Sequence, residues 1–473
     1  MATDSPPHIA LAAGFAAADA AAWTALAEKT LKGAPLESLT RRTLEGLPIR
    51  PLYEPAADLA PIARTEPGWD VRSPVRAHRP AKAADEATAA LRDGAQSLLL
   101  AIGPTGLAAA SEDDVARALE GVVLDAAPVA LEAGFAGPQA ADWLAAAAKG
   151  SPAAPLAFHL DPLSAFAEAG ASAGPIEAHL IAAATVAARL AEPYPRASLF
   201  LASGRFAHEA GAGEALEVAL ALASAVAYAK ALTRAGLAMP EAFARVVLGL
   251  AIDADAFLSI AKLRAARRAW ARLATACGAG ATARIEARSS ARMLTRADPW
   301  TNMIRLTAAA FAGAVGGADA VVLGAFTDAL GPPTAFALRQ SRNIQLVLKE
   351  EAHLGRVVDP AAGGGYVEAL TDEIARAAWA RFQAIEAAGG LVAALENGVI
   401  ARQVEAARTE LAARLQRGET RLLGVTDFPA PEGLRAAEIA SPEVAADTAR
   451  SLRLPGPDSR CPRLAPIRLE TLA

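Results

Sequence analysis

The chain has 473 residues, with 46 lysines and arginines against 51 aspartates and glutamates, and 53% of its residues are hydrophobic. The net charge of −5 argues against the concentrated basic face that nucleic acids and anionic membranes require, so we expect neither as a partner. The two cysteines, Cys277 and Cys461, lie far apart in the sequence, which fits a reducing compartment better than a disulfide framework.

Targeting and membrane segments are not expected. The N-terminus has no basic region ahead of an apolar run, unlike a secretory signal. The longest helical stretch of low charge, residues 215–228, is shorter than the roughly 20 residues that span a bilayer. We therefore predict a soluble, cytoplasmic protein.

Residues 1–90 are predicted to form an N-terminal helix and an extended arm. Residues 17–32 have the apolar periodicity of an amphipathic helix. The eight prolines that follow, from Pro35 to Pro80, favour an extended segment that lies on another surface. We expect apolar arm residues such as Leu47 and Tyr53 to find no core of their own.

After the arm, short apolar runs alternate with helical segments. The runs lie at residues 97–102, 128–132, 155–160, 197–202, 245–252, 282–287, 320–324 and 356–359. Strands that alternate with helices imply a parallel α/β sheet, and eight such units close into a (β/α)8 TIM barrel. We assign residues 91–395 to this barrel and residues 396–473 to a helical extension with a proline-rich tail.

The residues at the C-terminal ends of the strands decide what a barrel can bind. The candidates for substrate binding at the barrel mouth are Ser203, Arg205, His208, Ser289 and Arg292. His159 and Asp161 are the nearest approach to a metal-ligand group, but too few histidines converge, and we predict no metal site. The glycines at residues 363–365 fit either a phosphate loop or the turn before a helix.

Several motifs resemble those of the adenosylcobalamin-dependent methylmalonyl-CoA mutases. Residues 298–305 read DPWTNMIR, where the family has DPxxNxxR, and residues 342–345 read RNIQ, where it has RNTQ. Residues 359–368 resemble the family's DPxGGSxYVE, and residues 261–267 resemble its AKMRAAR helix. The resemblance covers nearly the whole chain and implies an isomerase that interconverts methylmalonyl-CoA and succinyl-CoA.

The stretches that contact substrate in this family have changed. Catalytic members read SGYHMQEAG where residues 203–211 read SGRFAHEAG, so Phe206 replaces a histidine that contacts the substrate carbonyl. Phenylalanine cannot donate a hydrogen bond to that oxygen. The family's RQYAG segment is missing, RxHxQTSG has become the charged RIEARSSA at 284–291, and GGTQSLHTN has become GGADAVVLG at 316–324. We therefore predict no catalytic residue in this chain.

The cobalamin-binding motif DxHxxG is also missing. The nearest string, EAHLGR at residues 351–356, differs at its first and last positions, and we interpret His353 as the end of a helix. We expect this chain to bind no cofactor, and we predict that residues 396–473 contain no cobalamin-binding domain.

The combination resembles the small, non-catalytic (beta) subunit of a heterodimeric methylmalonyl-CoA mutase. The resemblance implies a large catalytic subunit as partner, which alone binds adenosylcobalamin and acyl-CoA, with the arm lying on that partner. From the apolar runs at residues 98–102 and 321–323 we also predict that branched side chains at alternate positions point inward and block the barrel axis. Two alternatives remain open: the active acyl-CoA-binding chain of a split mutase with a separate cobalamin subunit, and a repurposed barrel that binds or regulates something else.

Overall fold

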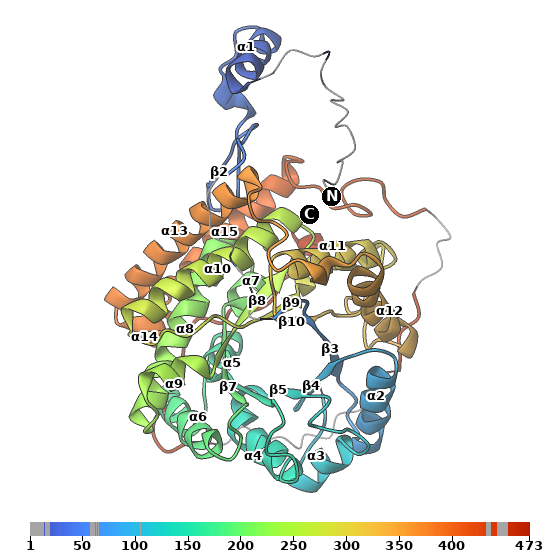
Figure 1. Cartoon of the computed structure of the whole chain (residues 1–473), viewed down its shortest axis with the longest axis vertical. Helices are drawn as coiled ribbons and strands as arrows, with labels where there is room; N and C mark the ends of the chain where they lie inside the picture. Colours follow the sequence, from blue (N-terminus) through green and yellow to red (C-terminus); the bar gives the residue numbers. More distant parts are fainter. Residues whose placement is uncertain are drawn as a thin grey trace, which may run out of the picture.

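A closed barrel of parallel strands, ringed by helices, forms the body of the protein (Figure 1). The computed structural model describes residues 14, 19–56, 62, 64, 66–104, 106–431, 437–441 and 453–473. The barrel strands are β3 (Asp70–Val75), β4 (Ser97–Ala101), β5 (Val129–Glu132), β6 (Ala157–Leu160), β7 (Ser198–Ser203), β8 (Val246–Ile252), β9 (Ile285–Ser289) and β10 (Ala320–Val322). Strand β10 pairs with both β9 and β3, which closes the barrel and confirms the predicted (β/α)8 fold.

Helices connect successive strands on the outside of the barrel. They are α2 (Pro80–Arg92), α3 (Glu112–Ala118), α4 (Gly137–Ala147), α5 (Pro162–Ala169), α6 (Ile176–Ala191), α7 (Arg205–Glu209), α8 (Glu214–Arg234), α9 (Met239–Ala244), α10 (Ala256–Ala276), α11 (Thr301–Val315) and α12 (Ala335–Leu346). Helices α13 (Gly365–Ala387), α14 (Gly390–Glu396) and α15 (Val399–Gln416) follow. Short helical turns lie at η2 (Gly134–Ala136), η3 (Ala291–Met293), η4 (Val347–Glu351), η5 (Leu354–Arg356) and η6 (Leu469–Thr471).

Several helices begin at side-chain caps that the sequence already indicates. The Asp255 carboxylate accepts a hydrogen bond from the backbone N–H of Leu258 at the start of α10, at 3.2 Å. Asp161 caps α5 in the same way, ahead of a proline in the first turn. Such caps satisfy backbone donors that the first helical turn leaves free.

The first barrel strand was not predicted, and the predicted eighth strand is wrong. Strand β3 and helix α2 lie inside the range assigned to the arm, so the barrel begins near residue 70 rather than at residue 91. Residues 356–359 form no strand but follow the short turn η5. The sequence of β3 does not resemble that of a buried barrel strand, because Asp70 and Arg72 are polar and Pro74 lies within the strand.

Helix α8 is the one described helix long and apolar enough to cross a membrane. It is largely buried inside the protein, where it packs against β7, β8 and α13. Burial on all sides is typical of a core helix, which explains the apolar composition without a bilayer.

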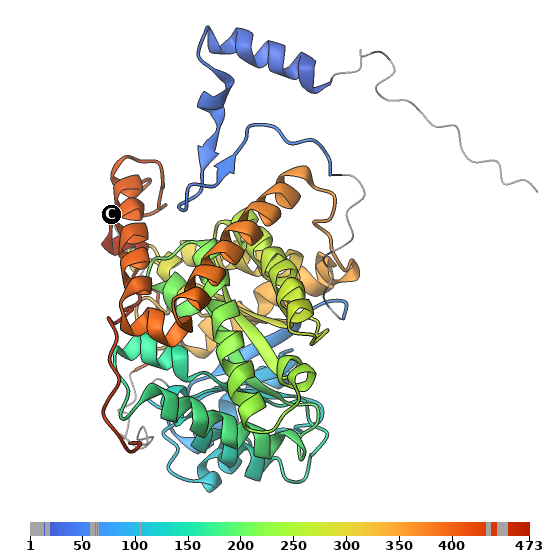
Figure 2. The ribbon, with the colours of Figure 1, turned by 90° about the vertical axis from the view of Figure 1, so that its left-hand side faces the viewer.

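The N-terminal arm projects from the barrel (Figure 2). It contains α1 (Ala20–Leu31), the turn η1 (Leu36–Leu39) and a hairpin of β1 (Arg41–Arg42) and β2 (Pro48–Ile49). Helix α1 has no buried residue, and Leu26 is 66% exposed. Of the predicted helix 17–32, residues 17 and 18 lie outside the described residues.

The hairpin end of the arm is fastened to the barrel. The Glu45 carboxylate accepts hydrogen bonds from the backbone N–H groups of Ala215 (2.7 Å) and Leu216 (3.0 Å), at the N-terminus of α8. Arg381 of α13 pairs with the same carboxylate at 3.3 Å. Leu47 packs against the main core and Tyr53 lies against Tyr366, so the expectation that these side chains find no core is wrong.

We predict that Glu45→Ala lowers the free energy of unfolding by about 1–2 kcal/mol, because it removes both a helix cap and a charge that favours the positive end of the α8 dipole. Chemical denaturation measures the change. The matched control is Glu37→Ala, at an exposed position of the same arm, which should change stability by less than about 0.5 kcal/mol. Equal effects of the two substitutions would show that the Glu45 contacts do not hold the arm.

Candidate functional site

Side chains that point inward from the strands occupy the barrel axis. Leu99, Ala130, Ala157 and Val322 form a small buried apolar layer. Leu98 belongs instead to the large outer core between the strands and the helices. The alternation confirms that Leu99 and Val322 are branched residues that face the axis, as expected.

A chain of ion pairs, which the sequence did not predict, shares the axis with this layer. Glu286 accepts hydrogen bonds from Arg72 Nη1 and from Arg288 Nε, both at 2.6 Å. Arg288 also pairs with Glu132 at 2.7 Å, and Arg72 pairs with Asp70 at 2.9 Å. Burial alone would raise the pKa of Glu286, but the charges of Arg288 and Arg72 hold that pKa far below its usual range.

His159 lies in the same interior with a left-handed backbone, at φ 45°. Its Nδ1 is 3.7 Å from Glu286, and burial lowers the pKa of His159 to about 3, so the ring is neutral. Asp161 instead faces away to cap α5 and to accept a hydrogen bond from the Tyr228 hydroxyl. The two residues weighed as metal ligands therefore do not converge, and across the described ranges no group of three His, Cys, Asp or Glu side chains suits a metal ion.

A pocket of about 380 Å³ lies at the C-terminal ends of the strands, where barrel enzymes bind their substrates. Its charged lining residues are Arg76, Arg205, Arg288, Arg463, Glu132, Glu168, Glu209 and Asp328. Its apolar lining includes Leu99, Phe206, Leu294, Val322 and Leu464. The pocket is therefore a charged chamber with an apolar floor.

The structure divides the five predicted binding residues between two places. Arg205 and Ser289 line the pocket, and the Ser289 hydroxyl accepts a hydrogen bond from the N–H of Gly324 at 2.8 Å. Ser203 is buried beneath it, with its hydroxyl accepting from the N–H of Arg205 at 3.2 Å. His208 and Arg292 do not line the pocket.

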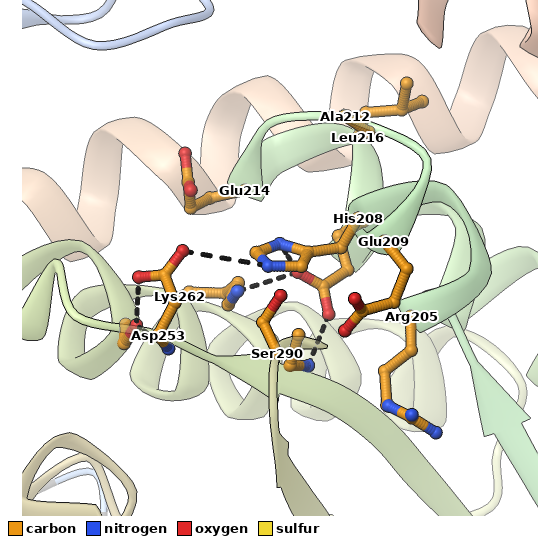
Figure 3. A network of polar contacts seen from close by, with 12 residues as sticks. Arg205, His208, Glu209, Ala212, Glu214, Leu216, Asp253, Lys262 and Ser290 are labelled. Carbon is orange, nitrogen blue, oxygen red and sulfur yellow. Dashed lines mark hydrogen bonds and ion pairs between the residues drawn. The ribbon is translucent and has the colours of Figure 1, made fainter. Parts of the chain in front are cut away.

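His208 and Arg292 instead belong to a buried cluster between β7, β8, α8 and α10, in which both lie against Asp253. Figure 3 shows His208 in this cluster beside Asp253 and Lys262. Glu217 Oε2 lies 3.1 Å from His208 Nδ1 and 2.7 Å from Lys262 Nζ. Arg292 pairs with Asp253 at 3.1 Å and donates to the backbone carbonyls of His208 and Ala212. These contacts connect the loop after β7 to α8 and to the segments after β8 and β9, so His208 and Arg292 have a structural role.

The charges in this cluster are fixed by burial and by pairing. Burial would raise the pKa of Glu217, but Lys262 and His208 bring it far below its usual range. Burial lowers the pKa of His208, and Arg292 and Lys262 lower it further, so the imidazole is neutral. Glu217 therefore carries the negative charge that Lys262 needs.

Phe206 occupies the position of the family histidine and lies at the floor of the pocket with 1% of its surface exposed. Its ring offers no donor to a carbonyl oxygen. The pocket thus lacks a polar hydrogen at the point where catalytic relatives of this kind present one.

Residues near the C-terminus cover the pocket. The backbone N–H groups of Cys461, Leu464 and Ile467 donate to the carbonyls of Gly170 (2.9 Å), Ala167 (2.9 Å) and Glu209 (2.8 Å), respectively. We call residues 453–467 the C-terminal strap. Its residues Arg463, Leu464 and Pro466 line the pocket, which no local sequence pattern indicates because they lie about 300 residues from the loops they cover.

The string that most resembles a cobalamin motif does not fit a cobalt ligand. His353 is exposed at the start of η5, on the outside of the barrel between the segments that carry α12 and α13. The glycines at 363–365 precede α13, and Gly365 is its first residue. Both segments lie in the connections between α12 and α13, in the shell of the barrel.

The closed parallel barrel and the pocket at the C-terminal ends of its strands place this protein in the class of α/β barrel enzymes and their relatives. Within that class, the family model described as methylmalonyl-CoA mutase matches residues 81–454. The chain is 40% identical over 451 residues to the methylmalonyl-CoA mutase small subunit of Streptomyces virginiae, covering 89% of this chain and 72% of that protein. It is 39% identical to a probable small subunit of Mycobacterium bovis, covering 78% of this chain and 60% of that protein.

A third relative, the small subunit from Propionibacterium freudenreichii subsp. shermanii, is 36% identical over 72% of this chain and 53% of its own length. The chain thus spans between about half and three quarters of the length of these relatives. It belongs to the methylmalonyl-CoA mutase family, and the relatives named here are small subunits.

We predict that Glu217→Gln lowers the free energy of unfolding at pH 7 by about 2–4 kcal/mol, because it leaves the buried Lys262 ammonium without its partner charge. The folded pKa of Glu217 lies below the ordinary 4.5, so its stabilisation is present above pH 4.5 and is lost as the pH falls. Denaturation curves between pH 7 and pH 3 should therefore show a gap between wild type and variant that narrows on acidification. Glu241→Gln, at an exposed carboxylate, is the control; a constant gap would contradict the assignment.

Proposed function

We propose that this chain is the non-catalytic small subunit of an adenosylcobalamin-dependent methylmalonyl-CoA mutase. It supports a large subunit that binds the cofactor and the acyl-CoA and isomerises methylmalonyl-CoA to succinyl-CoA. The chain alone is inactive and binds no cobalamin. Cytoplasmic localisation is part of the same proposal, since both free cysteines fit a reducing compartment.

The observation that carries the proposal is the barrel interior. A radical enzyme of this family must hold a thioester along the barrel and polarise its carbonyl. Here the Glu286 ion pairs and the Leu99 layer take up the axis, and Phe206 stands at the histidine position. The same features argue against the active acyl-CoA-binding chain of a split mutase.

The arm supports the proposed partner. Its hairpin is anchored by Glu45, whereas α1 extends outward with Leu26 exposed (Figure 2). An exposed apolar helix on a fixed base is suited to docking against another subunit. The names of the relatives as small subunits agree with a larger partner.

We predict that Leu26→Glu weakens association with the large subunit at least tenfold, because it places a charge in an apolar contact that must lose water. Co-expression followed by calorimetric titration of the purified subunits measures this. Val123→Glu is the matched control, since Val123 is 67% exposed on the barrel body and lies outside the arm. If both variants bind as wild type does, the arm helix is not a docking element.

We predict that Phe206→His restores no mutase activity to the isolated chain, because one imidazole does not reopen the occupied axis. The assay is succinyl-CoA formation in the presence of adenosylcobalamin, with the assembled complex as positive control. Turnover by the isolated Phe206→His variant would show that the barrel axis is open to substrate, and turnover by the wild-type chain alone would refute the non-catalytic assignment.

A further inference from the structure

The pocket under the C-terminal strap contains an arginine, Arg205, whose guanidinium makes no direct ion pair with any described residue, although the carboxyl groups of Glu168 and Glu132 lie near enough to feel its charge. Arg288 pairs with Glu286 and Glu132, and Arg76 pairs with Asp328 at 3.4 Å. Among the described residues, none accepts a hydrogen bond from the Arg205 guanidinium or forms an ion pair with it. Its Nε is buried without a partner.

Arg205 is aimed at the pocket and not at the neighbouring ion pairs. Figure 3 shows its side chain extending away from the His208 cluster, and its residue lines the pocket. An arginine stays charged at all ordinary pH values, and a partly buried guanidinium without an anion is costly. The hydrogen-bonding positions of the Arg205 guanidinium are therefore open to an anionic ligand.

The carboxylates around the pocket are mostly engaged elsewhere. Glu132 is held by Arg288, and Asp328 accepts from the N–H of Ala325 and from Arg76. Glu209 accepts hydrogen bonds from the N–H groups of Ala291 and Arg292. Glu168 also lines the pocket near Arg205, and burial of its carboxyl raises its pKa to about 7, so its negative charge is only partly present at neutral pH.

The shape of the pocket restricts the length of the ligand. Its floor is closed by Leu99, Phe206 and Val322, and its roof by Leu464 and Pro466 of the strap. A volume of about 380 Å³ is near the lower end of the range for small-molecule sites. An alkyl group of a few carbons fits against this floor, whereas a long thioester arm has no path through the occupied axis.

We propose that the mouth pocket binds a free short-chain monocarboxylate, with its carboxylate on Arg205 and its alkyl end on Phe206, Leu99 and Val322. Arg205 and a carboxylate form a charge-assisted pair with two parallel N–H···O bonds. The site is formed by residues of this chain. Its occupancy stabilises the closed strap, because Leu464 and Arg463 share the pocket with the ligand.

Sodium propionate, titrated into the full chain and followed by calorimetry and by saturation-transfer NMR, tests the proposal. We expect saturable binding, with saturation transferred to the propionate methyl group from the aromatic protons of the pocket. Arg205→Met should weaken binding at least tenfold, which is the loss expected for a charge-assisted hydrogen-bonded pair, and Arg205→Lys should weaken it less. Arg376→Met, at an exposed arginine on α13, is the matched control and should bind as wild type does.

Propionamide and inorganic phosphate separate the alternatives. Propionamide keeps the shape without the charge and should bind at least tenfold more weakly; phosphate keeps the charge without the alkyl group and should not compete. The proposal is overturned if propionate shows no saturable binding up to about 20 mM, a concentration far above that of a specific site. It is equally overturned if Arg205→Met, with an unchanged unfolding temperature, binds as tightly as wild type, or if phosphate or propionamide binds as well as propionate.

Discussion

The buried carboxylate of Glu286 is the constraint on which the interior of the barrel depends. It lies inside a closed ring of strands with 1% of its side chain exposed, and two arginines share its negative charge. Removing Glu286 would take away the one carboxylate that Arg72 and Arg288 share, in a medium that solvates charges poorly. The members of the network take up space along the axis. A ligand that entered the axis would have to displace charges that are paired with one another.

The loop after β7 contains one residue that faces the pocket and one that is held in the core. Phe206 faces the pocket, while His208, two residues later, turns into the cluster with Glu217 and Lys262. The imidazole that remains in this segment is neutral and buried, where it positions the loop rather than a substrate. The presence of Phe206 at the histidine position, together with the strap that covers the mouth, fits the proposal of a subunit that acts through its outer surface.

The barrel was predictable from the sequence because seven of its strands are short apolar runs followed by capped helices. Strand β3 was missed because its inward residues, Asp70 and Arg72, are polar, and because only the folded barrel brings Glu286 within reach of Arg72. Ser289 and Arg205 were found from their place after strands, but Arg463 was not, since its contact with the mouth joins parts of the chain about 300 residues apart. The positions of His208 and Arg292 after strands also predicted that both line the mouth. In the structure His208 contacts Glu217 and Arg292 pairs with Asp253, and these contacts hold both residues in the core.

The most direct test of the account is the number of acyl-CoA sites in the assembled complex. A non-hydrolysable methylmalonyl-CoA analogue, titrated calorimetrically into the complex of this chain with its large subunit, reports that number. The account predicts one site per pair of subunits and none on this chain alone. Two sites per pair, or saturable binding of the analogue to this chain, would show that the barrel interior is open to substrate and would contradict the central claim.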